Sequence, residues 1–150
     1  MPVDWDRITR AEFDALCESL VRREHRTARV QVYDGAGGDG GRDVVVTDAG
    51  RVTIYQLKHF PGRIPARNPN RRSQVEASLK SAVRHDPVRW VLVVPTRLNQ
   101  HEHAWFDRLA ATVQFTVDLW DKTALDDACA RNADLVVQHM RSASTYLLRP

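Results

Sequence analysis

The sequence predicts an α/β domain with one mixed sheet that is flanked by helices on both faces. Segments with the two-residue alternation of strands and segments with the spacing of amphipathic helices follow one another in the order α-β-β-β-α-β-α-β-α. Helices separate only the later strands, which is typical of a meander continued by crossover units. The 150 residues are enough for one domain spanning residues 1–150.

The opening helix has a clear start signal. Thr9 and Glu12 form the T-x-x-E pattern of a capping box, and Ile8 and Phe13 have the spacing of the hydrophobic contact that accompanies it. Apolar residues then recur on one helical face as far as Val21. We therefore expect an amphipathic helix that begins just after Thr9.

Three strands follow this helix. Residues 28–34 alternate between apolar and polar side chains, and residues 42–48 and 51–58 are rich in β-branched residues. Ala49 and Gly50 separate the last two segments and are suited to a tight turn. The sequence therefore predicts a hairpin centred on these two residues.

Residues 59–72 hold three prolines, four arginines and no acid, which predicts an irregular, exposed and basic segment. A helix is expected from Ser73. The remaining predicted elements are a buried strand at 89–95, a helix opened by Asn99, a strand at 115–120 and one or two closing helices at 121–140.

The composition excludes several classes of protein. The longest apolar run is far shorter than the roughly 20 residues of a membrane helix, and the N-terminus lacks the pattern of a signal peptide. Cys17 and Cys129 are expected to be free core thiols rather than a disulfide, which suits a cytoplasmic protein. Residues 142–150 contain no clear signal that a domain ends there, so the chain could be the N-terminal part of a longer protein.

Positive charge is concentrated in the middle of the chain. Residues 51–100 hold 10 Lys and Arg against 2 Asp and Glu, although the whole chain has a net charge of only +3. Arginine supplies most of this charge and offers a planar fork of donors to phosphate groups. A solvated basic surface explains the composition equally well.

A G-x-G-x-x-G pattern formed by Gly35, Gly37 and Gly40 raises the question of nucleotide binding. A dinucleotide fingerprint must open a helix whose N-terminus holds the pyrophosphate. Here the valine-rich segment 42–48 predicts a strand instead. We therefore expect that Gly40 and Gly41 let the chain turn tightly and let a phosphate backbone or metal approach.

The predicted hairpin brings three polar side chains together. With Ala49 and Gly50 as the turn centre, Asp43 lies directly opposite Gln56, and Lys58 follows on the same face. A carboxylate, an amide and an ammonium group therefore converge at one end of the hairpin. The glycine-rich loop enters the sheet at that same end.

These motifs give the chain a family resemblance. "GGDGGRDVVV" followed by "YQLKHF" resembles the Mrr-like branch of the PD-(D/E)xK nucleases, which have a restriction-endonuclease-like fold with an αβββαβ core. "EFDAL" resembles the opening helix of that family, and "RWVLVVPT" and "FTVDLWDKTAL" resemble its later part. The likeness extends from about residue 11 to residue 130 and leaves a C-terminal strand and helices as additions to the core.

The resemblance implies a Mg²⁺-dependent DNA endonuclease, with Mn²⁺ as a substitute metal. Asp43 would be the principal metal ligand, helped by the side-chain oxygen of Gln56 and the backbone carbonyl of Leu57. Lys58 would orient or deprotonate the attacking water. Asp14 matches the helix glutamate of the family, and Glu18 lies one turn further along the same face, so either could complete the metal site.

The basic segment would then contact double-stranded DNA. Candidate contacts are His59, Arg63, Arg67, Arg71 and Arg72, although a solvated loop is an equal alternative for the arginines. Cleavage of both strands needs two active sites, which implies a homodimer or larger assembly. A recognition or activating partner, and a role as the effector of bacterial defence against foreign DNA, are further implications of the resemblance.

A non-catalytic nucleic-acid-binding module on the same fold is the alternative hypothesis. Gln56 stands where an acid is usual in this superfamily, so the site has one negative charge fewer than the common pattern. Both hypotheses predict salt-sensitive DNA binding. Cleavage in the presence of a divalent metal distinguishes them.

Overall fold

The computed structural model describes residues 3–34, 41–66 and 69–140, and these residues form five strands in one mixed sheet. The spatial order is β1-β2-β3-β4-β5, with antiparallel β1–β2 and β2–β3 pairs and parallel β3–β4 and β4–β5 pairs. The predicted mixed sheet is thereby confirmed. The strands are β1 (Arg29–Asp34), β2 (Arg42–Asp48), β3 (Arg51–Leu57), β4 (Arg89–Val93) and β5 (Thr116–Trp120).

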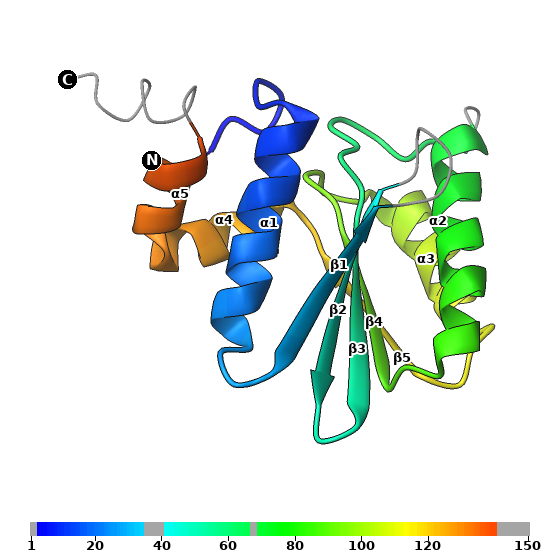
Figure 1. Cartoon of the computed structure of the whole chain (residues 1–150). Coiled ribbons are helices and arrows are strands. Elements are labelled where there is room, and N and C mark those ends of the chain that lie inside the picture. The colour runs from blue at the N-terminus through cyan, green and yellow to red at the C-terminus, as the bar shows by residue number, and fades with distance from the viewer. Residues whose placement is uncertain (1–2, 35–40, 67–68, 141–150) are drawn as a thin grey trace.

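Helices cover both faces of this sheet, as predicted (Figure 1). One layer contains α1, α4 and α5, and the opposite layer contains α2 and α3. The bounds are α1 (Arg10–Glu24), α2 (Pro69–Ala82), the 3₁₀ turn η1 (Val83–His85), α3 (Gln100–Ala110), α4 (Lys122–Arg131) and α5 (Ala133–His139). The closing segment therefore forms two helices.

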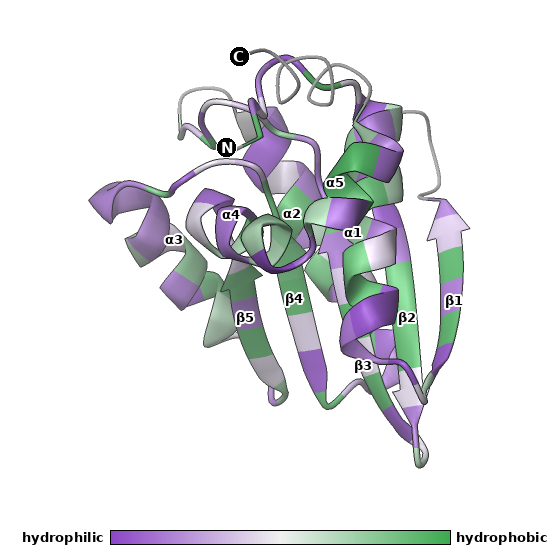
Figure 2. Cartoon of the chain, turned by 90° about the vertical axis from the view of Figure 1, so that its left-hand side faces the viewer, coloured by the Kyte–Doolittle hydropathy of each residue, from purple (hydrophilic) through white to green (hydrophobic). Residues whose placement is uncertain are grey.

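The first helical layer packs on the face of the sheet to which β2 presents Val44 and Val46. The capping box of Thr9 and Glu12 is present, so α1 begins where its sequence predicts. Phe13 is fully buried and shares one hydrophobic core with these valines. Figure 2 views this layer from outside, with α1, α4 and α5 in front of strands that carry apolar bands.

A second core lies between the opposite face of the sheet and the helices α2 and α3. Ile54 and Trp90 come from neighbouring strands, and Leu79 and Trp105 come from the two helices. Side chains alternate between faces along a strand, so β3 and β4 contribute to both cores. This sharing explains why β4 lacks a polar face.

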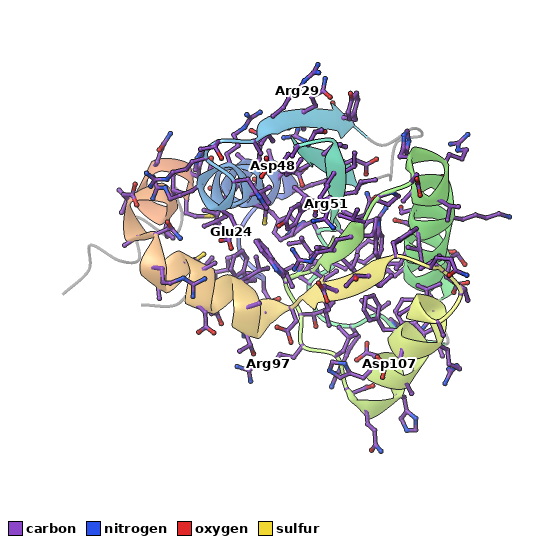
Figure 3. All side chains as sticks on the ribbon, turned by 90° about the horizontal axis from the view of Figure 1, so that it is seen from below. Glu24, Arg29, Asp48, Arg51, Arg97 and Asp107 are labelled. Atoms are coloured by element: carbon purple, nitrogen blue, oxygen red, sulfur yellow. The ribbon has the colours of Figure 1, made fainter. Side chains whose placement is uncertain are left out.

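The β2–β3 hairpin turns where the sequence predicts. Ala49 has φ 52° and Gly50 has φ 79°, and two positive φ values favour a two-residue turn that matches the twist of the strands. Asp48 pairs with Arg51 beside the turn. Seen from below, the labelled Asp48 and Arg51 mark this end of the sheet, and side chains project from the strands toward both helical layers (Figure 3).

The prediction for residues 59–72 was wrong in two respects. Helix α2 begins at Pro69, four residues before Ser73, because proline suits the first turn of a helix, where its missing N–H is not needed. The preceding segment is also not fully exposed, since Phe60 and Ile64 are buried in the second core. Two apolar anchors therefore fix this segment against the sheet.

Cys17 and Cys129 are both free and buried, as expected. In the described parts of the chain, no helix combines the length and the apolar character needed to cross a membrane.

Candidate active site

The structure brings Asp43, Gln56 and Lys58 to one end of the β2–β3 hairpin. Asp43 and Gln56 are direct partners in the antiparallel register, which confirms the predicted pairing. Lys58 follows the last residue of β3, and its backbone N–H donates to the Val93 carbonyl at 3.0 Å. This bond continues the ladder beyond β3 and places the Lys58 side chain on the same face as Gln56.

All three side chains line a cavity of about 740 Å³ between the sheet and α2. Gln56 and Lys58 lie deep within it, with 4% and 2% of their surface exposed, whereas Asp43 is half-buried. Seven further polar side chains line the cavity and were not predicted from the sequence: Gln31, Tyr33, Thr47, Gln74, Ser78, Ser81 and His85. The register shows why Tyr33 belongs there, because it pairs directly with Asp43 across β1 and β2.

Burial disfavours the charged forms of Asp43 and Lys58. Desolvation raises the pKa of Asp43, although a hydrogen bond from the Gln56 side chain and the positive charges of Lys58 and His85 oppose this shift. Desolvation also lowers the pKa of Lys58, against the attraction of Asp43. A lysine with a lowered pKa loses its proton more readily than an exposed one, which suits a group that accepts a proton from water.

Gly41 is needed because its backbone lies against the end of β3. A Cβ atom at this position would lie 1.9 Å from the Leu57 carbonyl oxygen and 2.9 Å from Cδ of Lys58. Only glycine permits this approach. Gly35, Gly37 and Gly40 lie outside the described residues, but a strand rather than a helix follows them, as predicted.

Asp14 and Glu18 do not line the cavity. Asp14 is buried and lies 3.9 Å from Arg10. Burial raises the pKa of Asp14, and the charges of Arg42 and Arg10 oppose the shift. Glu18 lies 3.9 Å from Arg22. The helix α1, which carries both acids, packs against the face of the sheet opposite the cavity.

The donor set fits a hard cation with few protein ligands. The Asp43 carboxylate and the side-chain oxygen of Gln56 are oxygen donors on adjacent strands, and Mg²⁺ prefers oxygen and retains several waters. Gly41 itself places no side chain against the Leu57 carbonyl. Within residues 3–34, 41–66 and 69–140, no group of three or more His, Cys, Asp and Glu side chains is arranged to hold a metal.

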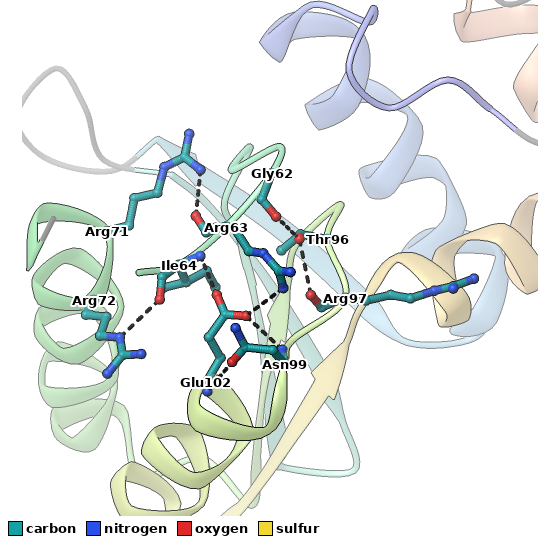
Figure 4. Close-up of polar contacts among 9 residues, drawn as sticks. All are labelled: Gly62, Arg63, Ile64, Arg71, Arg72, Thr96, Arg97, Asn99 and Glu102. Atoms are coloured by element: carbon teal, nitrogen blue, oxygen red, sulfur yellow. Dashed lines mark hydrogen bonds and ion pairs between the residues drawn. The ribbon is translucent and has the colours of Figure 1, made fainter. Parts of the chain in front are cut away.

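The basic segment is used largely to hold its own fold. Arg71 donates to the carbonyls of Pro61 and Arg63, each at 2.8 Å, and its guanidinium lies over the Phe60 ring. Arg72 donates to the Ile64 carbonyl at 3.0 Å (Figure 4). These two arginines therefore anchor the segment to α2.

The other predicted DNA contacts differ in their surroundings. His59 packs against the Phe13 ring at a centroid distance of 5.2 Å, on the α1 side of the sheet. Burial lowers its pKa, and a hydrogen bond with the Trp5 backbone opposes the shift. Arg63 is 61% exposed, and Arg67 lies outside the described residues.

Glu102 is a structural residue whose second role was not predicted. Its carboxylate accepts from the backbone N–H of Asn99 at 2.7 Å, as the capping box requires. It also accepts from the backbone N–H of Ile64 at 2.6 Å and from Arg63 at 3.3 Å (Figure 4). The buried acid thereby ties the basic segment to α3.

A scan against models of protein families finds none that matches this chain, and a search of curated proteins finds no match either.

Proposed function

We propose that the chain is a Mg²⁺-dependent DNA endonuclease of the Mrr-like PD-(D/E)xK kind. The observation that carries the proposal is the convergence of Asp43, Gln56 and Lys58 in one cavity, with Asp43 directly opposite Gln56. The order of elements from α1 to β4 also agrees with the αβββαβ core that the motifs imply. The convergence of the two motifs and this order of elements support the proposal.

The residues divide the chemistry among themselves. Asp43 would hold Mg²⁺ together with the side-chain oxygen of Gln56 and the carbonyl of Leu57, and a bound Mg²⁺ supplies charge stabilisation on phosphate and acidifies water. Lys58, with its lowered pKa, would accept a proton from the attacking water or stabilise charge on the phosphate. Gln56 would also orient the Asp43 carboxylate through its hydrogen bond.

The partners belong to the same proposal. Double-stranded DNA is the proposed substrate, and a homodimer or larger assembly would supply the two sites that cleavage of both strands needs. We place the protein in the cytoplasm, as an effector of bacterial defence against foreign DNA. A separate domain or protein would supply recognition or activation.

One observation favours a non-catalytic module that holds DNA. Asp43 is the only carboxylate that lines the cavity among the described residues, and Asp14 pairs with arginine instead. A single carboxylate attracts a divalent cation less strongly than two. Such a module would bind DNA without cutting it.

Plasmid cleavage tests the proposal. Purified wild-type protein is incubated with supercoiled plasmid and Mg²⁺ or Mn²⁺, with and without a chelator, beside Asp43→Ala and Lys58→Ala. We expect metal-dependent cutting by the wild type alone. Wild-type levels of cutting in both variants would overturn the assignment, and DNA binding without cutting by any of the three would favour the module.

A further inference from the structure

The cavity contains an aromatic side chain beside the proposed catalytic carboxylate. Tyr33 on β1 is the direct partner of Asp43, which is in turn the direct partner of Gln56. Directly opposite residues on antiparallel strands have Cβ atoms about 5 Å apart. Tyr33 is 51% exposed, so its ring remains accessible while it lines the cavity. An accessible ring beside the site offers a stacking surface.

The opposite wall offers hydrogen bonds. Helix α2 contributes Gln74 together with the hydroxyls of Ser78 and Ser81. The side-chain oxygen of Gln74 is buried and has no hydrogen-bond partner within the described part of the chain. A buried acceptor without a partner is costly, and a ligand that donates a hydrogen bond removes that cost.

The charges of the cavity do not suit a run of phosphates. Among the described residues, Lys58 and His85 are the only basic side chains that line it, and no arginine does. Arg71 and Arg72 instead donate to backbone carbonyls of the basic segment. Amides, hydroxyls and one aromatic ring are the groups that bind a nucleobase by its edge and its face.

The size of the cavity points to the same class of ligand. A volume of about 740 Å³ lies within the usual range of small-molecule pockets, which accommodates a nucleotide. Gln56 and Lys58 lie nearly fully buried in it. Enzymes that do chemistry on a base take single-stranded substrate or extrude a nucleotide from the duplex. A cavity that encloses a base has the same requirement, because a stacked and paired base cannot enter it.

We propose that this cavity holds one unpaired nucleotide of the DNA substrate. The base stacks on Tyr33 and donates a hydrogen bond to Gln74, and its phosphate faces Asp43 and Lys58. A duplex must therefore open locally at the site of cleavage, so single-stranded DNA binds more tightly than a fully paired duplex. The inference rests on the proposed function for the identity of the phosphate site.

Fluorescence anisotropy without divalent metal tests binding separately from cleavage. The probes are a labelled single-stranded DNA, a blunt linear duplex without unpaired nucleotides and a single-stranded RNA. The variants are Tyr33→Ala, Tyr33→Phe and Gln74→Ala, with Gln138→Ala on the exposed surface of α5 as the matched control. Circular dichroism confirms that each variant is folded.

We expect tighter binding of single-stranded DNA than of duplex. Tyr33→Ala should weaken it by roughly 5- to 150-fold, because a stacked base contributes about 1–3 kcal/mol. Tyr33→Phe should retain most of the affinity, Gln74→Ala should lose several-fold, and Gln138→Ala should bind like the wild type. Equal or tighter duplex binding, preference for RNA, or an unaffected Tyr33→Ala would each overturn the inference.

The anisotropy experiment and the plasmid cleavage assay, the latter run also on Tyr33→Ala, together separate this inference from the proposed function. If no DNA is cut but single-stranded binding depends on Tyr33, the nucleotide site stands and the nuclease assignment falls. If the wild type cuts paired DNA and Tyr33→Ala cuts it equally well, the nuclease assignment stands and the nucleotide site falls.

Discussion

Two acidic side chains on the α2–α3 side of the sheet have opposite surroundings. Glu102 is 2% exposed, and its carboxylate accepts hydrogen bonds from Ile64, Asn99 and Arg63. Asp43 faces a cavity, and burial raises its pKa despite the hydrogen bond from Gln56. One acid is enclosed by donors, whereas the other receives a hydrogen bond from Gln56 and faces an open cavity.

This difference separates a structural charge from the charge that we propose to be functional. A buried carboxylate with several donors stabilises the segments that supply them, as Glu102 does for the loop before α2 and the start of α3. A desolvated carboxylate beside a lysine of lowered pKa retains capacity to bind a cation or a phosphate. The following substitutions should therefore affect stability at one acid and chemistry at the other.

The largest effect is expected from Lys58→Met on cleavage. The substitution retains the apolar stem and removes the ammonium group, so we predict a loss of roughly 10²- to 10⁴-fold in rate with little loss of folding. Lys80→Met, on the exposed surface of α2, is the matched control. The rate of plasmid nicking measures both, and an active Lys58→Met would remove Lys58 from the mechanism.

The next effect is a loss of stability at Glu102. Glu102→Ala removes the acceptor of three donors, one of them the buried N–H of Ile64, and should lower the free energy of unfolding by about 3 kcal/mol. Asp107→Ala, on the exposed side of the same helix, should change it by less than about 0.5 kcal/mol. Urea unfolding measures the difference, and equal effects of the two substitutions would contradict the structural role.

The sequence contains enough information to predict the pairing of Asp43 with Gln56 but only the capping contact of Glu102. Asp43 and Gln56 are paired by a local hairpin, and its two-residue turn at Ala49 and Gly50 sets the register. The contact of Glu102 with Ile64 spans 38 positions, and no local pattern encodes it. Sequence patterns therefore predicted the helix cap at Glu102 but not its second contact.

A smaller effect is expected at the glycine beside the site. Gly41→Ala places a Cβ atom against the Leu57 carbonyl oxygen and should cost about 2 kcal/mol, and it should also reduce cleavage by displacing Lys58. Gly50→Ala meets nothing within 4 Å, and its φ of 79° should cost about 1 kcal/mol without a change in cleavage by the folded protein. Thermal unfolding measures the loss of stability in each variant, and the rate of plasmid nicking measures the change in cleavage. A fully active Gly41→Ala would show that the close approach is dispensable.

The smallest effect is a gain in stability when both charges of the site are removed. Asp43→Asn with Lys58→Met should stabilise the protein by about 1 kcal/mol at neutral pH, a low figure because solvent screens the half-buried Asp43. Asp43→Asn alone should stabilise the protein less than the double substitution does, because Lys58 then lacks its charged partner.

The contributions of Asp43 and Lys58 to folding stability change with pH in defined directions. The pKa of Asp43 is raised in the folded state, so ionisation costs stability as the pH rises above the ordinary value of 3.8. The pKa of Lys58 is lowered, so its protonation costs stability below that pKa, and the cost disappears as the pH approaches 10.5. Any gain from Asp43→Asn should therefore vanish below pH 3.8. A gain that persists there would contradict the desolvation of Asp43.

Other parts of the site depend on packing that the sequence does not reveal. Asp14 has the spacing of a helix acid, but nothing in the sequence shows that α1 packs on the face of Val44 rather than on the face of Asp43. Arg71 and Arg72 belong to a basic run, and only the folded loop supplies the carbonyls to which they donate. Tyr33 pairs with Asp43 across a connection whose length alone sets no register.

The most direct test compares Asp43→Asn with Glu102→Gln in the same cleavage assay. Both substitutions remove one charge and change little in volume, and each rate of plasmid nicking in Mg²⁺ is divided by the folded fraction measured by circular dichroism. The account predicts that Glu102→Gln cuts at the wild-type rate per folded molecule and that Asp43→Asn does not cut. Cleavage by Asp43→Asn at the wild-type rate would contradict the assignment of Asp43 as the functional acid.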